Sequence, residues 1–346
     1  MFIRGDEDLP HLRPSTSEIS PNDWRVLSRY WYPVAVEGDV KRKPLPSKLL
    51  DVNLVIYRVE DAIAVALDIC PHRNIRLSIG DIVDDRLVCA FHGLAFNAKG
   101  QCTRIPCLRP DAKLPPSYRL TTFRSVLRYG LVWVCLDDES SEQIPMLPRA
   151  LEVGLDRLGF AVPRDWPVGA PHQIENYLDI AHLPFVHSKT IGGDRNFVPP
   201  VPRIEQTSDG LVVYARSDHA AEGGRAGLFD YVNTIHLPFC VYTDGQVPEG
   251  SSVLLPSYQM WNIAAPSSAH TCRVFWMFVL SEPSSTRESR PAPSGGDEIG
   301  TEDIRVLTHL MRADYPLDQK GQIHIPVDNI SIEYRKSLRN LGLARS

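Results

Sequence analysis

Short runs of apolar and β-branched residues, separated by turn residues, dominate the first part of the chain. Residues 53–59, 63–68, 87–90 and 130–136 each have the length of a strand, and glycine, aspartate or proline punctuates the chain between them. A short helix is expected before them, over residues 22–31. The pattern therefore predicts an all-β module that opens with one helix.

The pattern changes after a polar stretch at residues 137–148, which indicates a domain junction. We expect one domain over residues 1–140 and a second over residues 141–346. Helices in the second domain are predicted at 175–186, 301–312 and 329–341, and strands of an antiparallel sheet at 203–217, 231–242, 252–263 and 271–280. Residues 281–296 are rich in proline, serine and glycine, which indicates a loop. The expected fold class is α+β.

Composition and charge narrow the functional classes. The 346 residues are 43% hydrophobic, which is enough for two cores. The formal net charge is -5 and no long basic run occurs, so we expect no nucleic acid partner. No apolar run reaches the length of a membrane span, and the charged N-terminus does not resemble a secretory signal. These features predict a cytoplasmic protein without a membrane partner.

The chain contains 7 cysteines. An odd number in a chain of this size, without a signal peptide, argues against a disulfide framework. In a reducing compartment, cysteine commonly packs as a small hydrophobe or binds metal.

Two of the cysteines stand beside histidines in related motifs. Cys70 and His72 form a C-x-H motif, and Cys89 and His92 form a C-x-x-H motif. Two thiolates and two imidazoles suit a [2Fe-2S] cluster in which sulfur binds one iron and nitrogen the other. Structural zinc is the alternative, although zinc sites usually open with two cysteines. Two buried cysteines and two surface histidines without metal are a further alternative.

A second group of polar residues lies in the predicted helix 175–186. Glu175, Asp179 and His182 would share one helical face, because they are spaced by four and three residues. His187 would point away on an ideal helix, but Pro184 should deform the helix and bring it back toward His182. Two histidines and one carboxylate make the facial triad of a non-haem Fe(II) oxygenase. An ordinary polar helix face is the alternative interpretation.

The cysteine and histidine motifs and their flanking residues resemble the Rieske domain of ring-hydroxylating and demethylating oxygenases. The similarity extends over residues 67–73, 89–94 and 100–102. Respiratory Rieske proteins carry an additional cysteine in each loop, at the places where this chain has Ile75 and Phe91. The resemblance therefore favours the oxygenase branch.

The segment that ends at His187 resembles the catalytic signature D-x-x-H-x-x-x-x-H of Rieske oxygenases. The resemblance implies that His182 and His187 bind a mononuclear iron. It also implies that Asp179 connects His182 to the cluster ligand His92 of a neighbouring subunit and carries electron transfer between the two metals. The protein would then be a homotrimer.

The third iron ligand of this family lies late in the chain, usually as Asp in a Glu-Asp pair that opens a helix. Asp303, which follows Glu302, is the residue that the resemblance selects, and a favourable position at a helix N-terminus is the alternative role of this pair. Residues 308–310 depart from the family pattern, so Asp314 is kept as a second candidate. Asn176 matches an asparagine placed near the iron in related demethylases.

The resemblance covers most of the chain and is strongest to the vanillate, dicamba and methylxanthine demethylase group, including residues 329–339. It implies a Rieske domain followed by a catalytic domain of the helix-grip type. The implied function is a terminal oxygenase that activates O2 at Fe(II) and monooxygenates a small aromatic or heterocyclic compound, by demethylation or hydroxylation. The sequence has no G-x-G-x-x-G after a strand and no P-loop. NAD(P)H would therefore act only through a separate reductase, either directly or through a ferredoxin.

Three alternatives to this function remain open. The same metal sites could carry out cis-dihydroxylation of a ring, the chain could be a Rieske electron carrier without oxygenase activity, or zinc could staple a structural protein. Residues that could contact a flat substrate are weakly indicated in the predicted sheet; they are His236, Phe239, Tyr258 and Trp261.

Overall fold

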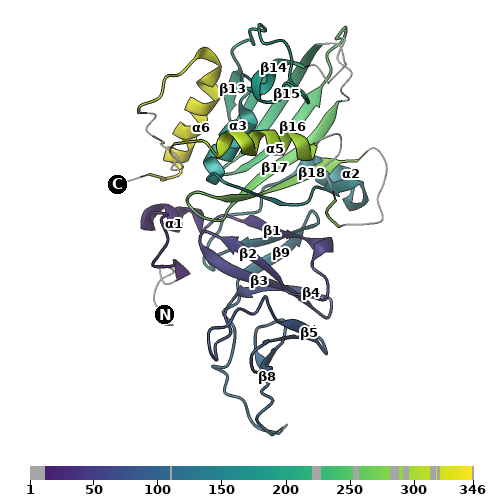
Figure 1. The fold of residues 1–346 in the computed structure, drawn as a ribbon, viewed down its shortest axis with the longest axis vertical. Coiled ribbons are helices and arrows are strands. Elements are labelled where there is room, and N and C mark those ends of the chain that lie inside the picture. The colour runs from purple at the N-terminus through teal and green to yellow at the C-terminus, as the bar shows by residue number, and fades with distance from the viewer. Residues whose placement is uncertain are drawn as a thin grey trace. The chain divides into compact units, whose positions relative to one another are not determined.

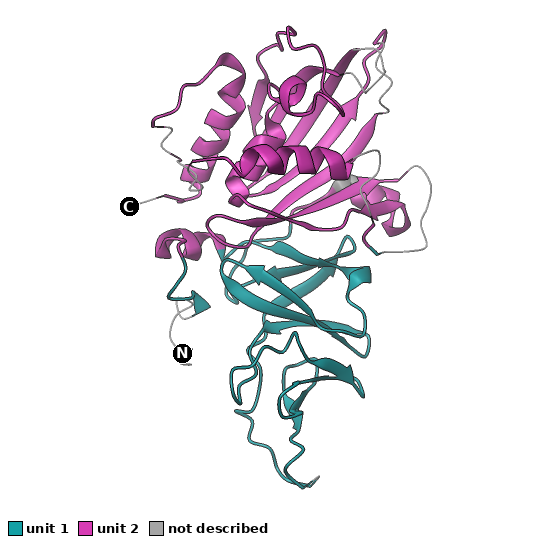
Figure 2. Cartoon of the chain, in the orientation of Figure 1, with its two compact units in different colours: residues 1–17, 28–144, 286–288 teal, residues 18–27, 145–285, 289–346 magenta. Residues whose placement is uncertain are grey.

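The computed structural model describes residues 12–109, 111–219, 227–251, 257–280, 288–290, 296–311, 317 and 320–344. The chain divides into two compact units (Figure 2). The first consists mainly of residues 28–144, and the second of residues 18–27, 145–285 and 289–346. None of the helices described is both long and apolar enough to cross a lipid bilayer.

The first unit is all-β (Figure 1). One three-stranded sheet has the order β1-β10-β9 and another has the order β2-β3-β4. Their strands are β1 (Tyr32–Val36), β2 (Leu45–Leu49), β3 (Val52–Val59), β4 (Ala62–Leu67), β9 (Arg124–Arg128) and β10 (Leu131–Cys135). A smaller sheet has the order β5-β6-β7-β8. It is built from β5 (Asp81–Val83), β6 (Arg86–Val88), β7 (Ala95–Phe96) and β8 (Cys102–Arg104). The all-β prediction for this part of the chain is therefore confirmed.

One core connects the strands of the first unit to the loops that carry the cysteine motifs. Val55 and Tyr57 of β3 are fully buried and pack in the same cluster as Leu87 and Phe96 of the smaller sheet. Cys70 and Cys89 belong to this cluster as well. The two loops are thus anchored by their cysteines, while the rest of each loop lies at the surface.

The second unit is organised around an antiparallel sheet with the order β11-β18-β17-β16-β15-β14-β13, with β12 also paired to β18. Its strands are β11 (Leu158–Phe160), β12 (Arg164–Trp166), β13 (Arg203–Gln206), β14 (Gly210–His219), β15 (Gly227–His236), β16 (Cys240–Gln246), β17 (Tyr258–Pro266) and β18 (Cys272–Val279). Helix α3 (Ala170–Leu178) packs on β17 and β18, and α6 (Asn329–Asn340) packs on α3 and β14. The predicted class, an antiparallel sheet flanked by helices, is confirmed.

Two predicted strands of the second unit are wrong, because each is a hairpin. Residues 203–217 fold as β13 and β14, with a turn before Gly210, where a Cβ atom would lie 1.8 Å from the carbonyl oxygen of Ile235. Residues 231–242 fold as β15 and β16, with Pro238 in the turn. Proline cannot donate a hydrogen bond to a sheet, which is consistent with its place between two strands. Residues 252–256 of a further predicted strand lie outside the described residues.

The helix bounds also differ from the predictions. Helix α1 covers only Pro21–Leu27, because the chain soon enters β1, and α5 begins at Gly296 and ends at Leu307. Asp297 and Glu298 lie in the first turn of α5, where carboxylates stabilise the positive end of a helix. Other helical segments among the described residues are α2 (Pro148–Val153), α4 (Leu183–Val186) and the short 3-10 turns Glu37–Asp39, Leu155–Arg157 and Pro326–Asp328.

Candidate metal centres

The predicted helix 175–186 is interrupted, and the interruption places both histidines. Helix α3 ends at Leu178, and Asp179 has an extended backbone with φ -75° and ψ 124°. The short helix α4 then begins at Leu183 with Pro184 in its first turn, a position that proline tolerates. The prediction that Pro184 deforms a continuous helix is therefore wrong, because the break precedes the proline.

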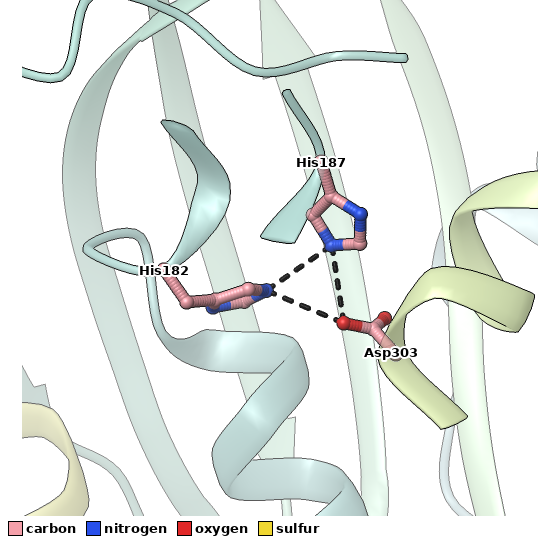
Figure 3. A group of neighbouring side chains, drawn as sticks. All are labelled: His182, His187 and Asp303. Carbon is pink, nitrogen blue, oxygen red and sulfur yellow. Dashed lines mark hydrogen bonds and ion pairs between the residues drawn. The ribbon is translucent and has the colours of Figure 1, made fainter. Parts of the chain in front are cut away.

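His182, His187 and Asp303 converge on one point (Figure 3). Nε2 of His182 lies 3.2 Å from Nε2 of His187, and Asp303 Oδ1 lies 3.1 Å from Nε2 of His187 and 3.5 Å from Nε2 of His182. The two histidines flank α4, and Asp303 lies in α5, which contacts α4. The structure thus brings Asp303 to two histidines that precede it by more than a hundred positions in the sequence.

The other ring nitrogen of each histidine has a carboxylate partner. Asp179 Oδ2 lies 3.2 Å from Nδ1 of His182, and Glu302 Oε2 lies 2.9 Å from Nδ1 of His187. Glu302 also accepts a hydrogen bond of 2.7 Å from Thr190 Oγ1. A proton on each Nδ1 would leave each Nε2 lone pair directed at the point of convergence, which is how metal-binding histidines are usually oriented.

The histidines and carboxylates of this centre shift one another's pKa values toward the charged forms. Burial alone would lower the pKa of His182, but hydrogen bonds to Asp179 and Asp303 raise it to about 9. Burial alone would raise the pKa of Asp303, but hydrogen bonds from the two histidines lower it to about 2. Asp303 is therefore a carboxylate, and it requires a positive partner in a buried place.

The arrangement fits a divalent iron. Asp303 Oδ1 is buried, and the two Nε2 atoms are its nearest polar neighbours among the described residues. Two imidazole nitrogens and one carboxylate oxygen on one side of a metal, with the other side open, are the ligand set of non-haem Fe(II) oxygenases. A metal ion at the point of convergence would satisfy all three atoms.

The three residues line a cavity of about 240 Å³ in the second unit. A cavity of this size can hold one small molecule. The walls are mainly aromatic and aliphatic. They include Trp166, Tyr177, Phe229, Tyr231, Tyr258, Met260, Trp276 and Phe278. Asn176, which the sequence placed near the iron, also lines the cavity.

Of the four weakly indicated substrate contacts, the structure places only Tyr258 in the cavity wall. Trp261 is fully buried and packs against Tyr242, with ring centroids 4.9 Å apart. Tyr258 and Met260 of the same strand face the cavity. Successive side chains of a strand point to opposite faces, so Trp261 points to the other side of the sheet. The expectation for Trp261 is therefore wrong.

His236 and Phe239 are also outside the cavity wall. His236 lies at the end of β15, and its Nδ1 lies 2.7 Å from Asp209 Oδ2. Tyr231 and Asn233 of the same strand line the cavity, and His236 lies an odd number of residues from each of them, so its side chain points to the opposite face of the sheet. Phe239 is buried in the turn after β15. Neither residue contacts the cavity, so these two expectations are wrong as well.

Glu175 does not share a face with the histidines. Its carboxylate accepts hydrogen bonds from Nε and Nη2 of Arg335 at 3.0 and 2.8 Å, in an ion pair between α3 and α6. Glu302 is the functional residue whose role the sequence did not indicate. A carboxylate immediately before the candidate ligand Asp303 was the available signal, but only a place at a helix N-terminus was considered as its alternative role. Asp314 lies outside the described residues.

In the first unit, the two cysteine motifs form loops with the same hydrogen-bond pattern. The Cys70 N–H donates to Ile75 O at 2.8 Å, and the Asn74 N–H donates to Cys70 O at 2.9 Å. In the second loop, the Cys89 N–H donates to Leu94 O at 2.9 Å, and the Gly93 N–H donates to Cys89 O at 3.0 Å. Asn74 and Gly93 both have a positive φ, 56° and 68°. The loops are therefore related in geometry as well as in sequence.

These loops bring four potential ligands together as two pairs, one of cysteines and one of histidines. Cys70 and Cys89 are buried, and their side chains are within hydrogen-bonding reach of each other. His72 and His92 are exposed, with ring centroids 4.6 Å apart. Burial is the largest effect on the Cys70 thiol and raises its pKa to about 11. A thiolate in that environment needs a cationic partner, and the iron of a [2Fe-2S] cluster provides one.

Comparisons with known proteins identify two known domains in this chain. Residues 30–124 match the family described as the Rieske [2Fe-2S] domain, and residues 168–344 match the vanillate O-demethylase oxygenase C-terminal domain. Methylxanthine N1-demethylase NdmA of Pseudomonas putida is 27% identical over 329 residues, which cover 92% of this chain and 91% of NdmA. Methylxanthine N3-demethylase NdmB of the same organism is 25% identical, with 93% and 91% covered.

Solved structures show the same similarity. NdmA from Pseudomonas putida CBB5 with caffeine superposes with a TM-score of 0.72 at 25% identity, and 91% of each chain is covered. Dicamba monooxygenase bound to 3,6-dichlorosalicylic acid shares the fold, with a TM-score of 0.70 at 20% identity and with 92% and 99% covered.

The chain belongs to the Rieske non-haem iron oxygenases, in the group whose catalytic domain is that of vanillate O-demethylase. It is therefore an oxidoreductase of the oxygenase class. Its cofactors are a [2Fe-2S] Rieske cluster and a mononuclear iron, O2 is its co-substrate, and a reductase supplies its electrons. The expected enzyme class and cofactors are confirmed.

Proposed function

We propose that this chain removes a methyl group from a small ring compound, as the oxygenase component of a system completed by a separate reductase. The convergence of His182, His187 and Asp303 on one wall of an aromatic cavity carries this proposal. The cavity volume of about 240 Å³ suits a compound of one or two rings. Demethylation of methylxanthines by the relatives NdmA and NdmB supports methyl removal over retained hydroxylation.

His182, His187 and Asp303 would hold the Fe(II), which supplies O2 activation when bound. Asp179 and Glu302 hold the Nδ1 side of each imidazole, so both rings are fixed before the metal binds. The aromatic walls exclude water from the reacting methyl group. Asn176 lines the same cavity and could contact the substrate near the iron.

Cys70, His72, Cys89 and His92 would bind the Rieske cluster. We further propose that residues 1–140 form the cluster domain and residues 141–346 the catalytic domain. Asp179 would connect His182 to His92 of a neighbouring copy, which requires a homotrimer. Electrons would reach the cluster from NAD(P)H through the reductase, with a ferredoxin as an additional carrier if the reductase does not dock directly.

The reaction balances with two electrons from the reductase. One oxygen atom of O2 is inserted into a C–H bond of the N- or O-methyl group, and the other leaves as water with two protons. The resulting N- or O-hydroxymethyl group then loses formaldehyde, which breaks the bond to nitrogen or oxygen and leaves an N–H or O–H. Formaldehyde is therefore the diagnostic product, whereas cis-dihydroxylation would give a diol.

The first experiment is to count iron and acid-labile sulfide in anaerobically purified protein and to measure formaldehyde with a reductase and methylated ring compounds. We expect about three irons and about two sulfides per chain. His187→Ala should lose the mononuclear iron and formaldehyde release but keep the sulfide. His309→Ala is the matched control, because His309 is exposed at the end of α5.

Each proposed alternative gives a distinct result. Two irons per chain with full sulfide and no turnover would support an electron carrier. Zinc without sulfide would support a structural protein. A diol without formaldehyde would replace demethylation by dihydroxylation.

A further inference from the structure

A chain of hydrogen bonds crosses one wall of the cavity and has a defined direction. It begins at His219, which is buried on β14 and lines the cavity. Nδ1 of His219 lies 2.6 Å from the backbone carbonyl oxygen of Ile191. A carbonyl can only accept, so the proton of the neutral imidazole lies on Nδ1, and Nε2 must accept. Burial lowers the pKa of His219, which keeps the ring neutral.

Two hydroxyl groups contact the accepting nitrogen. Tyr231 Oη forms a hydrogen bond with Nε2, and Ser217 Oγ lies 2.8 Å from the same atom. The phenol is the more acidic hydroxyl and is therefore the better donor to imidazole. The single proton of Tyr231 is thus committed to His219, and the oxygen of Tyr231 can only accept from its other neighbours.

Tyr258 continues the chain toward the cavity. It lies on β17, and its ring stacks on Phe229 at a centroid distance of 5.7 Å. Burial and the neighbouring hydroxyl of Tyr231 hold the pKa of Tyr258 well above its usual value, so this phenol keeps its proton. Because Tyr231 has no proton left to donate, Tyr258 donates to it. The remaining lone pairs of the Tyr258 oxygen are then available to a ligand, without a proton to offer.

In a second, independent chain of hydrogen bonds, each hydroxyl also donates to the next group. Thr243 donates its hydroxyl proton to Asn233 Oδ1 at 2.7 Å. Tyr177 Oη lies 2.7 Å from Thr243 Oγ1, so Tyr177 must be the donor in that contact. Burial, with a smaller contribution from nearby Tyr258, holds the pKa of Tyr177 well above its usual value, and the phenol keeps its proton. Tyr177 therefore also presents only lone pairs.

The charged residues that line the cavity favour an uncharged ligand. Among the described residues that line it, none is an arginine or a lysine, and the acidic residues are Asp179 and Asp303. The two carboxylates balance the charge of the Fe(II) that this centre would hold, so a carboxylate ligand would have no further cation to pair with. An uncharged ligand avoids this cost.

We infer that the cavity selects an uncharged, partly methylated ring compound that places an N–H or O–H donor against the oxygens of Tyr258 and Tyr177. The inference rests on the proposed function for the methyl group at the iron, but the donor requirement itself comes from the direction of the two hydrogen-bond chains. A fully methylated ring would leave these buried acceptors unpaired, and a donor-free analogue of equal shape should bind more weakly.

Matched ligands test the donor requirement without turnover. Caffeine carries a methyl group at N1, N3 and N7, whereas theobromine has an N–H at N1 and theophylline an N–H at N7. Calorimetric titration of the iron-loaded protein under argon, without reductase, should show theobromine or theophylline binding about tenfold more tightly than caffeine. 2-Naphthol and 2-methoxynaphthalene provide a second pair, and the carboxylate dicamba should bind most weakly.

Tyr258→Phe should reduce the preference for the donor-bearing ligand, because only the Tyr177 oxygen is then left to accept, and it should change the affinity for the methylated partner less than about twofold. Tyr242→Phe is the matched control, because Tyr242 packs on Trp261 at the opposite side of the same sheet, and it should keep the wild-type preference. The inference would be overturned if the methylated ligand bound equally or more tightly in both the xanthine pair and the naphthalene pair, or if dicamba bound most tightly. Formaldehyde release is scored separately, so a donor preference without formaldehyde would refute the proposed demethylation alone.

Discussion

Glu302 and His187 form a hydrogen bond of 2.9 Å between Oε2 and Nδ1, in which the imidazole N–H donates to the carboxylate. Nε2 of the same ring lies 3.1 Å from Asp303 Oδ1. Two consecutive residues of α5 therefore bracket one histidine: Glu302 contacts the Nδ1 side of the ring, and Asp303 is placed to share a metal with Nε2. Thr190 gives Glu302 a second hydrogen bond, so the carboxylate is itself held in place.

Replacing Glu302 by glutamine should weaken iron binding while the protein stays folded. The amide can still accept from Nδ1, but it no longer raises the basicity of the imidazole as a carboxylate does. Changes of this kind typically lower metal affinity by about 10- to 100-fold. Titration of chelator-treated protein with Fe(II) measures the affinity. Glu298→Gln, an exposed position in the first turn of the same helix, is the control, and equal affinities in the two variants would refute the role of Glu302.

Asp303 and Asp314 give a direct comparison for the third iron ligand. Asp303→Asn should lose the mononuclear iron, because a neutral amide cannot replace the buried carboxylate between two imidazoles. Asp314→Asn should keep it. Iron and sulfide per chain report the outcome: we expect about two irons in the first variant and about three in the second. The reverse pattern would assign the ligand to Asp314.

The parts of the fold that depend on local pattern were predictable from the sequence. The β-branched runs at 53–59 and 63–68 became β3 and β4, and the amphipathic stretch 329–341 became α6. The site histidines were predictable because their spacing resembles a family signature. Their position was not, because the break after Leu178 depends on the packing of α3 against β17 and β18.

The cavity wall could not be predicted for a related reason. Which side of a sheet a residue faces alternates along the strand, so one misplaced turn changes the assignment of everything beyond it. The sequence suggested one strand over 231–242, whereas the structure has a hairpin, and His236 and Phe239 were assigned to the wrong place. His219 and Tyr231, which form the polar wall, come from partner strands of a hairpin, and no local pattern connects them.

Asp68 should be required for the cluster loops to hold their shape. It is 2% exposed, and its carboxylate accepts hydrogen bonds from the Ser78 N–H at 2.7 Å and from Ser78 Oγ at 2.6 Å, just beyond the Cys70 loop. Asp68→Ala would leave a partly buried N–H without its acceptor, at a cost of about 1–3 kcal/mol. Thermal unfolding and acid-labile sulfide should both decrease. Asp81→Ala, at an exposed position of β5, should change neither, and normal sulfide in Asp68→Ala would contradict the prediction.

Arg335 should be important for stability rather than for chemistry. Its side chain is 4% exposed, and its guanidinium pairs with both carboxylate oxygens of Glu175, which connects α6 to the helix that precedes the iron site. Arg335→Ala would leave the Glu175 charge without its partner, and losing one member of a buried pair typically costs about 3–5 kcal/mol. Urea unfolding of the iron-loaded protein measures this cost. Lys336→Ala removes the neighbouring exposed pair with Glu333 and should change stability by less than about 0.5 kcal/mol. Similar losses in the two variants would show that the contact between α3 and α6 does not depend on this ion pair.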